Sequence, residues 1–379
     1  MKRTAPVLVA CSQTWSSPAR LPRVLARAGC RVSVLCPPGA PLASTRFADE
    51  RIAAPAELPA YVDALAEHLE RAGDRYRWLL ITDDPLLDAL ARRRAEPWIA
   101  ARLPIDGRSR FAALLASKAD FTDAAAAAGL PIPASRVCAS LSGARAAAAE
   151  IGFPVMLKKS LSFAGLGVRA AADDAELARA FLELDDGAPL VLQRFHQGRI
   201  GNSVVLFQEG RPICWMSAYK SRTWPGPFGP SSARQFMSHA DVEPILAAFG
   251  ALTGYHGFGA VDWVCDAVTG RLVILEFNAR PVPTIHMSRL AGVDFSSSIA
   301  AMLAGRAEVQ RPPERAPGPI VRMFPEDVYR AATEKQPLEL AGLLPWPGRY
   351  SDVPWSDPPL LAWHLRAFRR AAREQKRAA

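Results

Sequence analysis

Asp262, Glu276 and Asn278 carry side-chain oxygens at a spacing that suits a hard metal ion. Carboxylate and amide oxygens without sulfur ligands are typical of Mg²⁺, which keeps water and substrate phosphates as its remaining ligands. The sequence therefore predicts a metal site formed by these three residues. The alternative is an exposed polar face whose carboxylates pair with Arg280 and other basic side chains.

A β-hairpin would bring the two carboxylates together. Phe258–Asp266 and Leu272–Asn278 are alternating runs rich in aromatic and β-branched residues, and the three-residue loop Val268–Gly270 separates them. With such a loop, the register places Asp262 directly opposite Glu276. Like charges at opposed positions are destabilising, so we expect a positive charge between them.

A lysine-bearing strand is followed by a glycine-containing loop. The apolar run Pro154–Lys158 leads into Ser160–Gly167, which includes Gly165 and Gly167. Backbone N–H groups of such a loop can bind phosphate oxygens, and a lysine can hold a phosphate as a point charge. The loop is not a Walker A motif, because no GK[ST] follows, and an ordinary turn is the alternative. Lys118, taken by itself, is typical of a solvated helix residue.

The elements that position these residues follow from hydrophobic periodicity. In the first hundred residues, buried strands alternate with amphipathic helices, which indicates a parallel sheet with covering helices. No GxGxxG follows the first strand, so a dinucleotide-binding fingerprint is absent. Asp83 and Asp84 start a helix, as an N-cap or alternatively as a ligand contact. The expected strands are Pro6–Ala10, Arg31–Leu35 and Trp78–Thr82, and the expected helices are Leu21–Ala28, Leu58–Arg71 and Pro85–Arg94.

The rest of the chain mixes helices with hairpins. Leu103–Arg108 is a junction rich in turn residues, and a helix is expected from Ser109 to about Ala128, ending at Gly129. Further on we expect an αβ region at 134–190, strands at 190–220, a helix at 241–253, the hairpin at 258–278, a linker at 312–319 and an appendage rich in Pro and Trp at 320–379.

Composition bounds the class of protein. The chain has 379 residues, of which 50% are hydrophobic and 22% charged, which excludes disordered, collagen-like and small disulfide-rich classes. No apolar run reaches the roughly 20 residues that cross a bilayer, so no membrane span is expected. None of the six cysteines belongs to a CxxC motif, and we interpret them as reduced residues of a cytoplasmic protein.

The net charge of +9 is concentrated at the C-terminal end. From Arg366 onward, six basic residues stand against Glu374 alone. We expect a solvated or subunit-contacting helix there, with an acidic partner or a membrane surface as the alternative. The rest of the excess is small, so no nucleic-acid partner is expected, and the sequence is compatible with a homo-oligomer.

Taken together, these elements resemble the ATP-grasp superfamily over about residues 110–306, with the preceding αβ region also in place. A Ser-Lys helix, the strand Phe153–Lys158, the glycine loop and the strand Val191–Phe195 occur in the family's order. The most specific part is Glu276–Pro281, which carries an acid-x-Asn-x-Arg signature.

The resemblance implies an α/β chain that is α+β in its ATP-binding part. It divides the sequence into an N-terminal parallel-sheet αβ domain at 1–105, an ATP-grasp central lobe with the glycine loop at 106–188, a C-terminal lobe with the metal hairpin at 189–310, and an appendage with a basic helix at 311–379.

The same resemblance assigns roles to individual residues. Lys118 and Lys158 would contact ATP phosphates, with Lys159 adding positive charge, and the loop around Gly165 and Gly167 would fold over them. The hinge at the adenine edge would be Gln193, Arg194 and Phe195. The metal ligands would be Asp262, Glu276 and Asn278, holding Mg²⁺ or alternatively Mn²⁺. The catalytic cations would be Arg280, facing the transferred phosphate, and Lys220.

The implied activity is that of an ADP-forming ligase, which activates a small-molecule carboxylate as an acyl phosphate and joins it to a small-molecule amine. Phosphoryl transfer depends on positioning and charge neutralisation, which two lysines, an arginine and magnesium can supply. One alternative is carboxylate phosphorylation or carboxyphosphate chemistry without an amine acceptor. Another is a nucleotide-binding regulatory protein that has lost catalysis.

Substrate selection would involve residues that nucleotide binding does not explain. Lys220 and Arg222 precede 223–230, a stretch rich in Gly and Pro that is either a lid or an ordinary surface loop. His286 and Arg289 are candidates for binding a substrate carboxylate, the alternative being a satisfied histidine and a solvated arginine.

Overall fold

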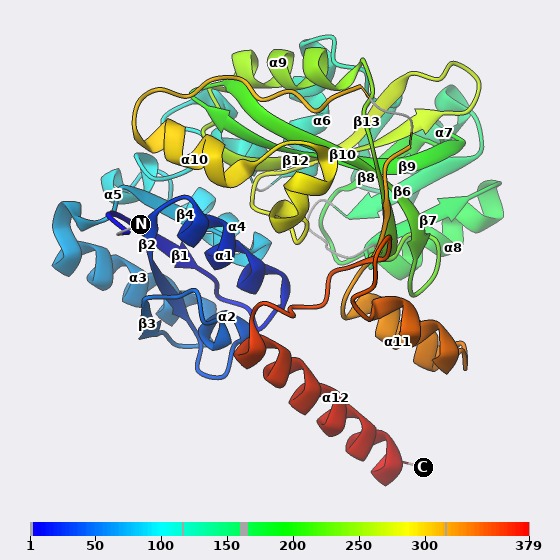
Figure 1. Cartoon of the computed structure of the whole chain (residues 1–379). Coiled ribbons are helices and arrows are strands. Elements are labelled where there is room, and N and C mark those ends of the chain that lie inside the picture. The colour runs from blue at the N-terminus through cyan, green and yellow to red at the C-terminus, as the bar shows by residue number, and fades with distance from the viewer. Residues whose placement is uncertain (1–2, 116, 160–165, 315–316, 379) are drawn as a thin grey trace.

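The structure is a computed structural model that describes residues 3–115, 117–159, 166–314 and 317–378. The side chains of Lys118 and of residues 375–378 lie outside the described part. Among the described residues, the strands form three sheets (Figure 1).

The N-terminal sheet is parallel throughout and has the strand order β3-β2-β1-β4. Three of its strands, β1, β2 and β4, are the apolar runs that the sequence predicted, and they alternate with helices. The edge strand β3 is partly exposed and was not predicted. The strands are β1 (Ala5–Ala10), β2 (Cys30–Cys36), β3 (Glu50–Ala53) and β4 (Trp78–Ile81), and the helices are α1 (Leu21–Arg27), α2 (Pro41–Ser44), α3 (Leu58–Ala72), α4 (Asp84–Arg92) and α5 (Pro97–Ala100).

A smaller antiparallel sheet follows, with the order β5-β8-β6-β7. Two helices whose apolar faces pack on it supply its core. The elements are β5 (Ser135–Cys138), α7 (Leu141–Ile151), β6 (Val155–Lys159), β7 (Val168–Ala171), α8 (Asp174–Leu184) and β8 (Leu190–Arg194).

The largest sheet has the order β13-β12-β9-β10-β11-β14-β15 and is antiparallel except for its last pair. The β14 and β15 strands come from the C-terminal segment, so this segment extends the sheet instead of forming a separate unit. The strands are β9 (Gly198–Gln208), β10 (Arg211–Thr223), β11 (Ser231–Met237), β12 (Gly257–Asp266), β13 (Leu272–Asn278), β14 (Ile320–Arg322) and β15 (Tyr350–Ser351), and the helices of this part are α9 (Val242–Thr253), α10 (Phe295–Leu303), α11 (Glu326–Thr333) and α12 (Pro358–Ala378).

The expected helix at 109–128 is interrupted. A 3-10 helix spans Arg110–Leu115, and α6 (Lys118–Ala127) begins after Ser117, whose hydroxyl accepts a hydrogen bond from the Asp120 N–H at 3.1 Å. The apolar periodicity runs through this point, but serine favours an N-cap over a helix interior because its hydroxyl satisfies a free backbone N–H.

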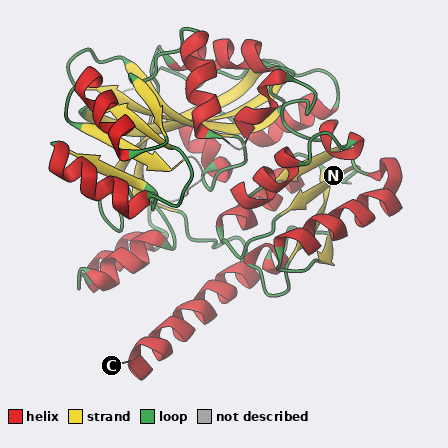
Figure 2. Cartoon of the chain, turned by 180° about the vertical axis from the view of Figure 1, so that it is seen from behind, coloured by secondary structure: helices red, strands yellow, loops and turns green. Residues whose placement is uncertain are grey.

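The N-terminal sheet and the largest sheet share their core. One apolar cluster joins Leu8 and Tyr61 to Phe207 and Trp263, whereas the smaller sheet has a cluster of its own, confined to residues 138–192. Seen from behind, the N-terminal sheet with its helices lies beside the two other sheets (Figure 2). Two parts of the molecule therefore form one packed body, and the smaller sheet is a separately packed lobe.

The C-terminal segment returns to the N-terminal sheet before it ends. Asp357 accepts a hydrogen bond from the Arg46 N–H at 3.0 Å, and Trp363 Nε1 donates to the Gly39 carbonyl at 2.9 Å. Phe368 of α12 still packs against Phe324 and Tyr329, and the C-terminal end of the helix extends away from the body of the molecule (Figure 1). None of the helices in the described part combines the length and apolar character that crossing a membrane requires.

Gly250 allows helix α9 to pack against the turn between β9 and β10. A Cβ atom at Gly250 would meet the Gly210 carbonyl oxygen at 1.9 Å, whereas one at Gly143 in α7 would meet only the Ser140 hydroxyl at 3.4 Å. Alanine normally stabilises a helix interior relative to glycine by up to about 1 kcal/mol. The close backbone approach, not helix propensity, therefore decides the residue at 250.

We expect Gly250→Ala to lower the free energy of unfolding by about 1–3 kcal/mol because of overpacking. Gly143→Ala, the control with the same chemical change, should be neutral or stabilising. Urea denaturation of both variants checks this, and equal effects at the two positions would contradict the packing argument.

Candidate active site

One cleft lies where the three sheets meet. Side chains of the N-terminal sheet's loops, the smaller lobe, the largest sheet and the C-terminal segment all face it. Its lining includes Arg20, Asp84, Lys158, Gln193, Phe195, Asn202, Lys220, Arg234, Asp262, Glu276, Asn278, Arg280, Glu326 and Asp352.

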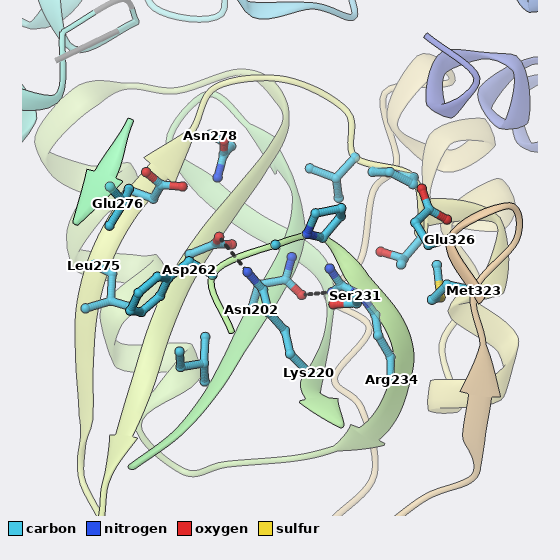
Figure 3. A pocket seen from close by; sticks show the side chains of 18 of the residues that line it. Asn202, Lys220, Ser231, Arg234, Asp262, Leu275, Glu276, Asn278, Met323 and Glu326 are labelled. Atoms are coloured by element: carbon cyan, nitrogen blue, oxygen red, sulfur yellow. Dashed lines mark hydrogen bonds and ion pairs between the residues drawn. The ribbon is translucent and has the colours of Figure 1, made fainter. Parts of the chain in front are cut away.

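Asp262 and Glu276 face each other inside this cleft, as predicted. They are direct cross-strand partners on β12 and β13. Lys220 places its Nζ 3.9 Å from Asp262 Oδ2 and supplies the expected positive charge (Figure 3). Burial and the charge of Glu276 raise the pKa of Asp262, and Lys220 opposes this shift.

The hairpin reaches this pairing by a different route from the one predicted. Its loop has four residues, because the Asp266 N–H donates to the Arg271 carbonyl at 2.9 Å and Cys265 pairs with Leu272. This register alone would set Leu275 opposite Asp262. A β-bulge between Asp262 and Trp263 skips Leu275 and restores Glu276 as the partner. The two differences cancel, so the prediction was right about the pair and wrong about the loop.

Asn202 extends the polar row onto a third strand. It is the β9 partner of Asp262, on the side away from Glu276, and its side-chain oxygen accepts a hydrogen bond from Arg234 Nη1. Asn278, two residues beyond Glu276, also lines the cleft (Figure 3). The site therefore presents a row of oxygen-bearing side chains across adjacent strands.

The two lysines of β6 point to opposite faces. Lys158 is 8% exposed and lines the cleft. Lys159 instead pairs with Asp186 at 2.6 Å outside the cleft, so its assignment to phosphate was wrong. The alternation of side chains along a strand explains the difference.

The predicted hinge residues lie at the end of β8 and directly after it, and they line the same cleft. Gln193 is 3% exposed, and its Oε1 is buried without a hydrogen-bond partner among the described residues. The Phe195 N–H donates to the Pro154 carbonyl at 3.1 Å, and Arg194 Nη2 donates to the Ile151 carbonyl, which ties the hinge to the smaller lobe. Gly167 lies just before β7, whereas Gly165 and the side chain of Lys118 lie outside the described residues.

Arg280 connects the hairpin to the N-terminal sheet. Its Nε and Nη2 donate to the two carboxylate oxygens of Asp84 at 2.6 and 2.7 Å. Asp83, the neighbouring residue, is the N-cap of α4 and accepts from the Leu86 N–H. Both alternatives left open by the sequence are therefore met: Asp83 caps the helix, and Asp84 faces the cleft.

Comparison with known proteins agrees with this geometry. Residues 117–191 match the family model for the ATP-binding domain of the carbamoyl-phosphate synthase L chain. The chain is 29% identical over 174 residues to the D-alanine--D-alanine ligase of Laribacter hongkongensis. The aligned region covers 42% of this chain and 54% of the ligase. It is 28% identical over 217 residues to the carbamoyl phosphate synthase large chain of Kineococcus radiotolerans, covering 54% of this chain and 20% of that protein. The chain thus spans about half the length of the first of these relatives and a fifth of the second.

Two solved structures share the fold over most of the chain. The biotin carboxylase domain of the Hydrogenobacter thermophilus 2-oxoglutarate carboxylase has a TM-score of 0.64 and 20% identity, covering 83% of this chain and 72% of that one. The L-amino acid ligase of Bacillus licheniformis has a TM-score of 0.59 and 16% identity, covering 80% and 75%. The matched family model and the shared fold support an assignment to the ATP-grasp superfamily. The mixed α/β architecture with its N-terminal parallel sheet matches this ATP-grasp assignment.

Three cations expected near the ATP-grasp substrate site lie elsewhere. Arg222 donates to Asp327 at 2.6 Å on the face of β10 opposite Lys220, because the register shifts between these two residues. Arg289 pairs with Asp294 at 2.6 Å and is 66% exposed. His286 contacts Asp352 at 2.6 Å behind the cleft wall. The residues of 227–230 do line the cleft.

The sequence analysis missed several cleft residues. Asn202 and Arg234 interrupt apolar strands, which indicates a polar site. Their cross-strand partners, Asp262 and Lys220, are distant in sequence, so one segment alone does not show that these residues lie together. Arg20, Glu326 and Asp352 carry no signal in the sequence, because only the fold brings both ends of the chain to one ATP-grasp cleft.

The Arg280–Asp84 pair predicts a stability difference. We expect Asp84→Asn to lower the free energy of unfolding by about 1–3 kcal/mol, because a partly buried guanidinium loses its counter-charge. Asp174→Asn, which breaks the exposed pair with Arg145, is the control and should cost about 0.5 kcal/mol or less. Thermal and urea unfolding measure both, and an equal loss would show that Asp84 does not anchor Arg280.

Proposed function

We propose that this protein is an ATP- and Mg²⁺-dependent ligase that activates a small carboxylate as an acyl phosphate and joins it to an amine, releasing ADP and phosphate. The observation that carries the proposal is the pairing of Asp262 with Glu276 in the same cleft as Lys158 and Arg280. That set provides both the carboxylates that a divalent cation needs and the cations that phosphates need.

The donor set fits magnesium nucleotide. Two opposed, partly buried carboxylates repel each other, and Lys220, 3.9 Å from Asp262, supplies a single positive charge beside them. Asp262, Glu276 and Asn278 would hold Mg²⁺, which when bound neutralises phosphate charge. At the hinge, the buried Gln193 Oε1 could accept a hydrogen bond from an adenine amino group, and Lys158 would hold a phosphate.

The chain's residues then position two displacements. In the first, a carboxylate oxygen attacks the γ-phosphorus of ATP, and the bond to the ADP oxygen breaks. In the second, an amine nitrogen attacks the acyl carbon, phosphate leaves, and the nitrogen loses a proton. Arg280, held in place by Asp84, would face the transferred group, and Lys220 would add charge beside the metal.

The relatives support the same chemistry at a coarser level. The family includes proteins that are D-alanine--D-alanine and L-amino acid ligases, and the 2-oxoglutarate carboxylase domain was solved with MgADP, ADP and bicarbonate. They support an ADP-forming reaction and do not select the substrate. The intact set of cations and carboxylates favours an enzyme over a regulatory nucleotide-binding protein.

Adjacent lysines provide a matched test of the nucleotide site. We expect Lys158→Met to weaken Mg·ADP binding about 10–100-fold, because a charge-assisted phosphate contact is lost. Lys159→Met, the control on the other face of β6, should change binding less than about 2-fold. Calorimetric titration measures both, and stronger weakening by Lys159→Met would contradict the assignment.

The metal assignment is tested at Glu276. Glu276→Gln should lower Mg²⁺-dependent ADP release at least about 100-fold with little change in fold, because one charge that holds the metal is removed. Glu183→Gln, on the exposed surface beside Arg169, is the control. Activity close to that of the wild type in Glu276→Gln would overturn the metal site.

The reaction class is tested by ADP release over a panel of small carboxylates with and without amines. We expect release to require a carboxylate and the product to contain a new C–N bond, detected by mass spectrometry. Release of ADP that is independent of any amine would instead favour carboxylate phosphorylation or carboxyphosphate chemistry.

A further inference from the structure

The end of the cleft away from Glu276 and Asn278 is lined largely by residues outside the proposed nucleotide and metal sites (Figure 3). Here β11 and the loop before the 3-10 helix Ile285–Ala291 meet the C-terminal segment, which contributes Met323, Glu326 and Asp352 (Figure 3). Asp352 is 4% exposed and is fixed by Arg20 and His286. The C-terminal segment is therefore a fixed wall of the cleft.

Several buried polar atoms at this end have no hydrogen-bond partner among the described residues. They are Arg234 Nε, Ser231 Oγ and Thr284 Oγ1, and the side chains of Ser231 and Thr284 are 5% and 2% exposed. A buried polar atom without a partner is destabilising unless something satisfies it. All three residues line the cleft, so a ligand there would satisfy atoms that the fold leaves open.

A bulge brings two of these residues to the same face. Thr223 pairs with Ser231 and Arg222 with Ala233, so Ser232 is an extra residue in β11. Without it, Ser231 and Arg234, three positions apart, would point to opposite faces of the strand. With it, both face the cleft.

Two opposite charges at this end are unmatched. Neither Arg234 nor Glu326 forms an ion pair with any residue in the described part of the chain. Asp262, Glu326 and Asp352 act on the pKa of Arg234 at longer range, and Asp352, Arg20 and Arg234 act on that of Glu326. Burial lowers the pKa of Arg234 and raises that of Glu326 to about 7, as expected for charges without close partners. Arg20 and Asp352, by contrast, pair with each other.

A ligand with one charge would satisfy only half of this arrangement. An anion would satisfy Arg234 and leave Glu326 without a partner, and a simple amine would do the reverse. A molecule with both an ammonium and a carboxylate matches both, and its second carboxylate oxygen can accept from Ser231 or Thr284.

We infer that this end of the cleft binds the zwitterionic head of an amino acid, with the carboxylate on Arg234 and Ser231 and the ammonium on Glu326. This subsite rests on the proposed function, since it makes one of the ligase's two substrates a free amino acid. It also gives the C-terminal segment a role in substrate recognition.

The first test uses the wild-type protein and matched analogues. ADP release at saturating Mg·ATP is measured over the twenty standard amino acids, singly and in pairs. The amino acid with the lowest KM is then compared with its decarboxylated amine and its N-acetyl derivative. If the amino acid reacts through its amine, the decarboxylated amine still reacts, and if it reacts through its carboxylate, the N-acetyl derivative still reacts. The KM of the analogue that still reacts reports recognition alone. We expect the KM of the analogue that still reacts to be about 10–100-fold higher than that of the amino acid.

Two variants separate the two charges. Arg234→Met and Glu326→Gln should each raise the KM for the amino acid at least about 10-fold. The KM of the analogue that still reacts should stay unchanged in one of them: in Arg234→Met if that analogue is the decarboxylated amine, and in Glu326→Gln if it is the N-acetyl derivative. The KM for ATP should stay within about 3-fold. Arg199→Met and Glu243→Gln, at an arginine of the same sheet and a first-turn glutamate outside the cleft, are the controls. If Arg234→Met does not fold, Arg234→Lys takes its place.

The outcomes distinguish this subsite from the proposed function. Analogues lacking one charge that work as well as the amino acid, while ADP release persists, would overturn the subsite and leave the ligase intact. Absence of ADP release and of Mg·ATP binding would overturn the ligase. In that case, calorimetric titration of the amino-acid panel against the wild type and Glu326→Gln decides the subsite: saturable binding that the variant weakens supports it, and absence of binding refutes it.

Discussion

Two carboxylates held opposite each other inside the protein are the constraint around which this cleft is organised. Asp262 and Glu276 would repel each other wherever they stood, and burial increases the cost because water no longer screens the charges. The surroundings compensate with positive charge: Lys220 approaches Asp262, and Arg280 and Arg234 contribute at longer range. An arrangement that is costly in the free protein is suited to binding a divalent cation together with phosphates.

The walls of the cleft differ in how they are packed against one another. The N-terminal sheet and the largest sheet share one apolar core, and the Arg280–Asp84 pair joins them at the site. The lobe that carries Lys158 and Gln193 has a core of its own. The residues proposed to bind phosphate and adenine therefore sit on a unit that is packed independently of the β12–β13 hairpin. The C-terminal segment adds strands to the largest sheet and hydrogen bonds to the N-terminal one.

Local irregularities in strands decide which side chains reach the cleft. The bulge at Leu275 sets Glu276 opposite Asp262, and shifts in the β10–β11 register send Lys220 into the cleft and Arg222 away from it. Sequence reasoning assumed regular alternation, which succeeded for the hairpin pair because two errors cancelled and failed for Arg222. Such bulges depend on how both strands pack against the rest of the sheet, so a single segment does not reveal them.

The sequence by itself determined the order of the elements, the parallel N-terminal sheet, the hairpin that pairs Asp262 with Glu276 and the lysine-bearing strand, because these follow from local periodicity and turn chemistry. It also carried the acid-x-Asn-x-Arg signature that indicated the family. Tertiary structure alone decided that Asp84 holds Arg280, that Lys159 faces away, and that Arg20, Arg234 and Glu326 share one cleft. The physical reason is the range of the interactions. Periodicity and capping act within a few residues, whereas ion pairs and cleft walls join residues up to hundreds of positions apart.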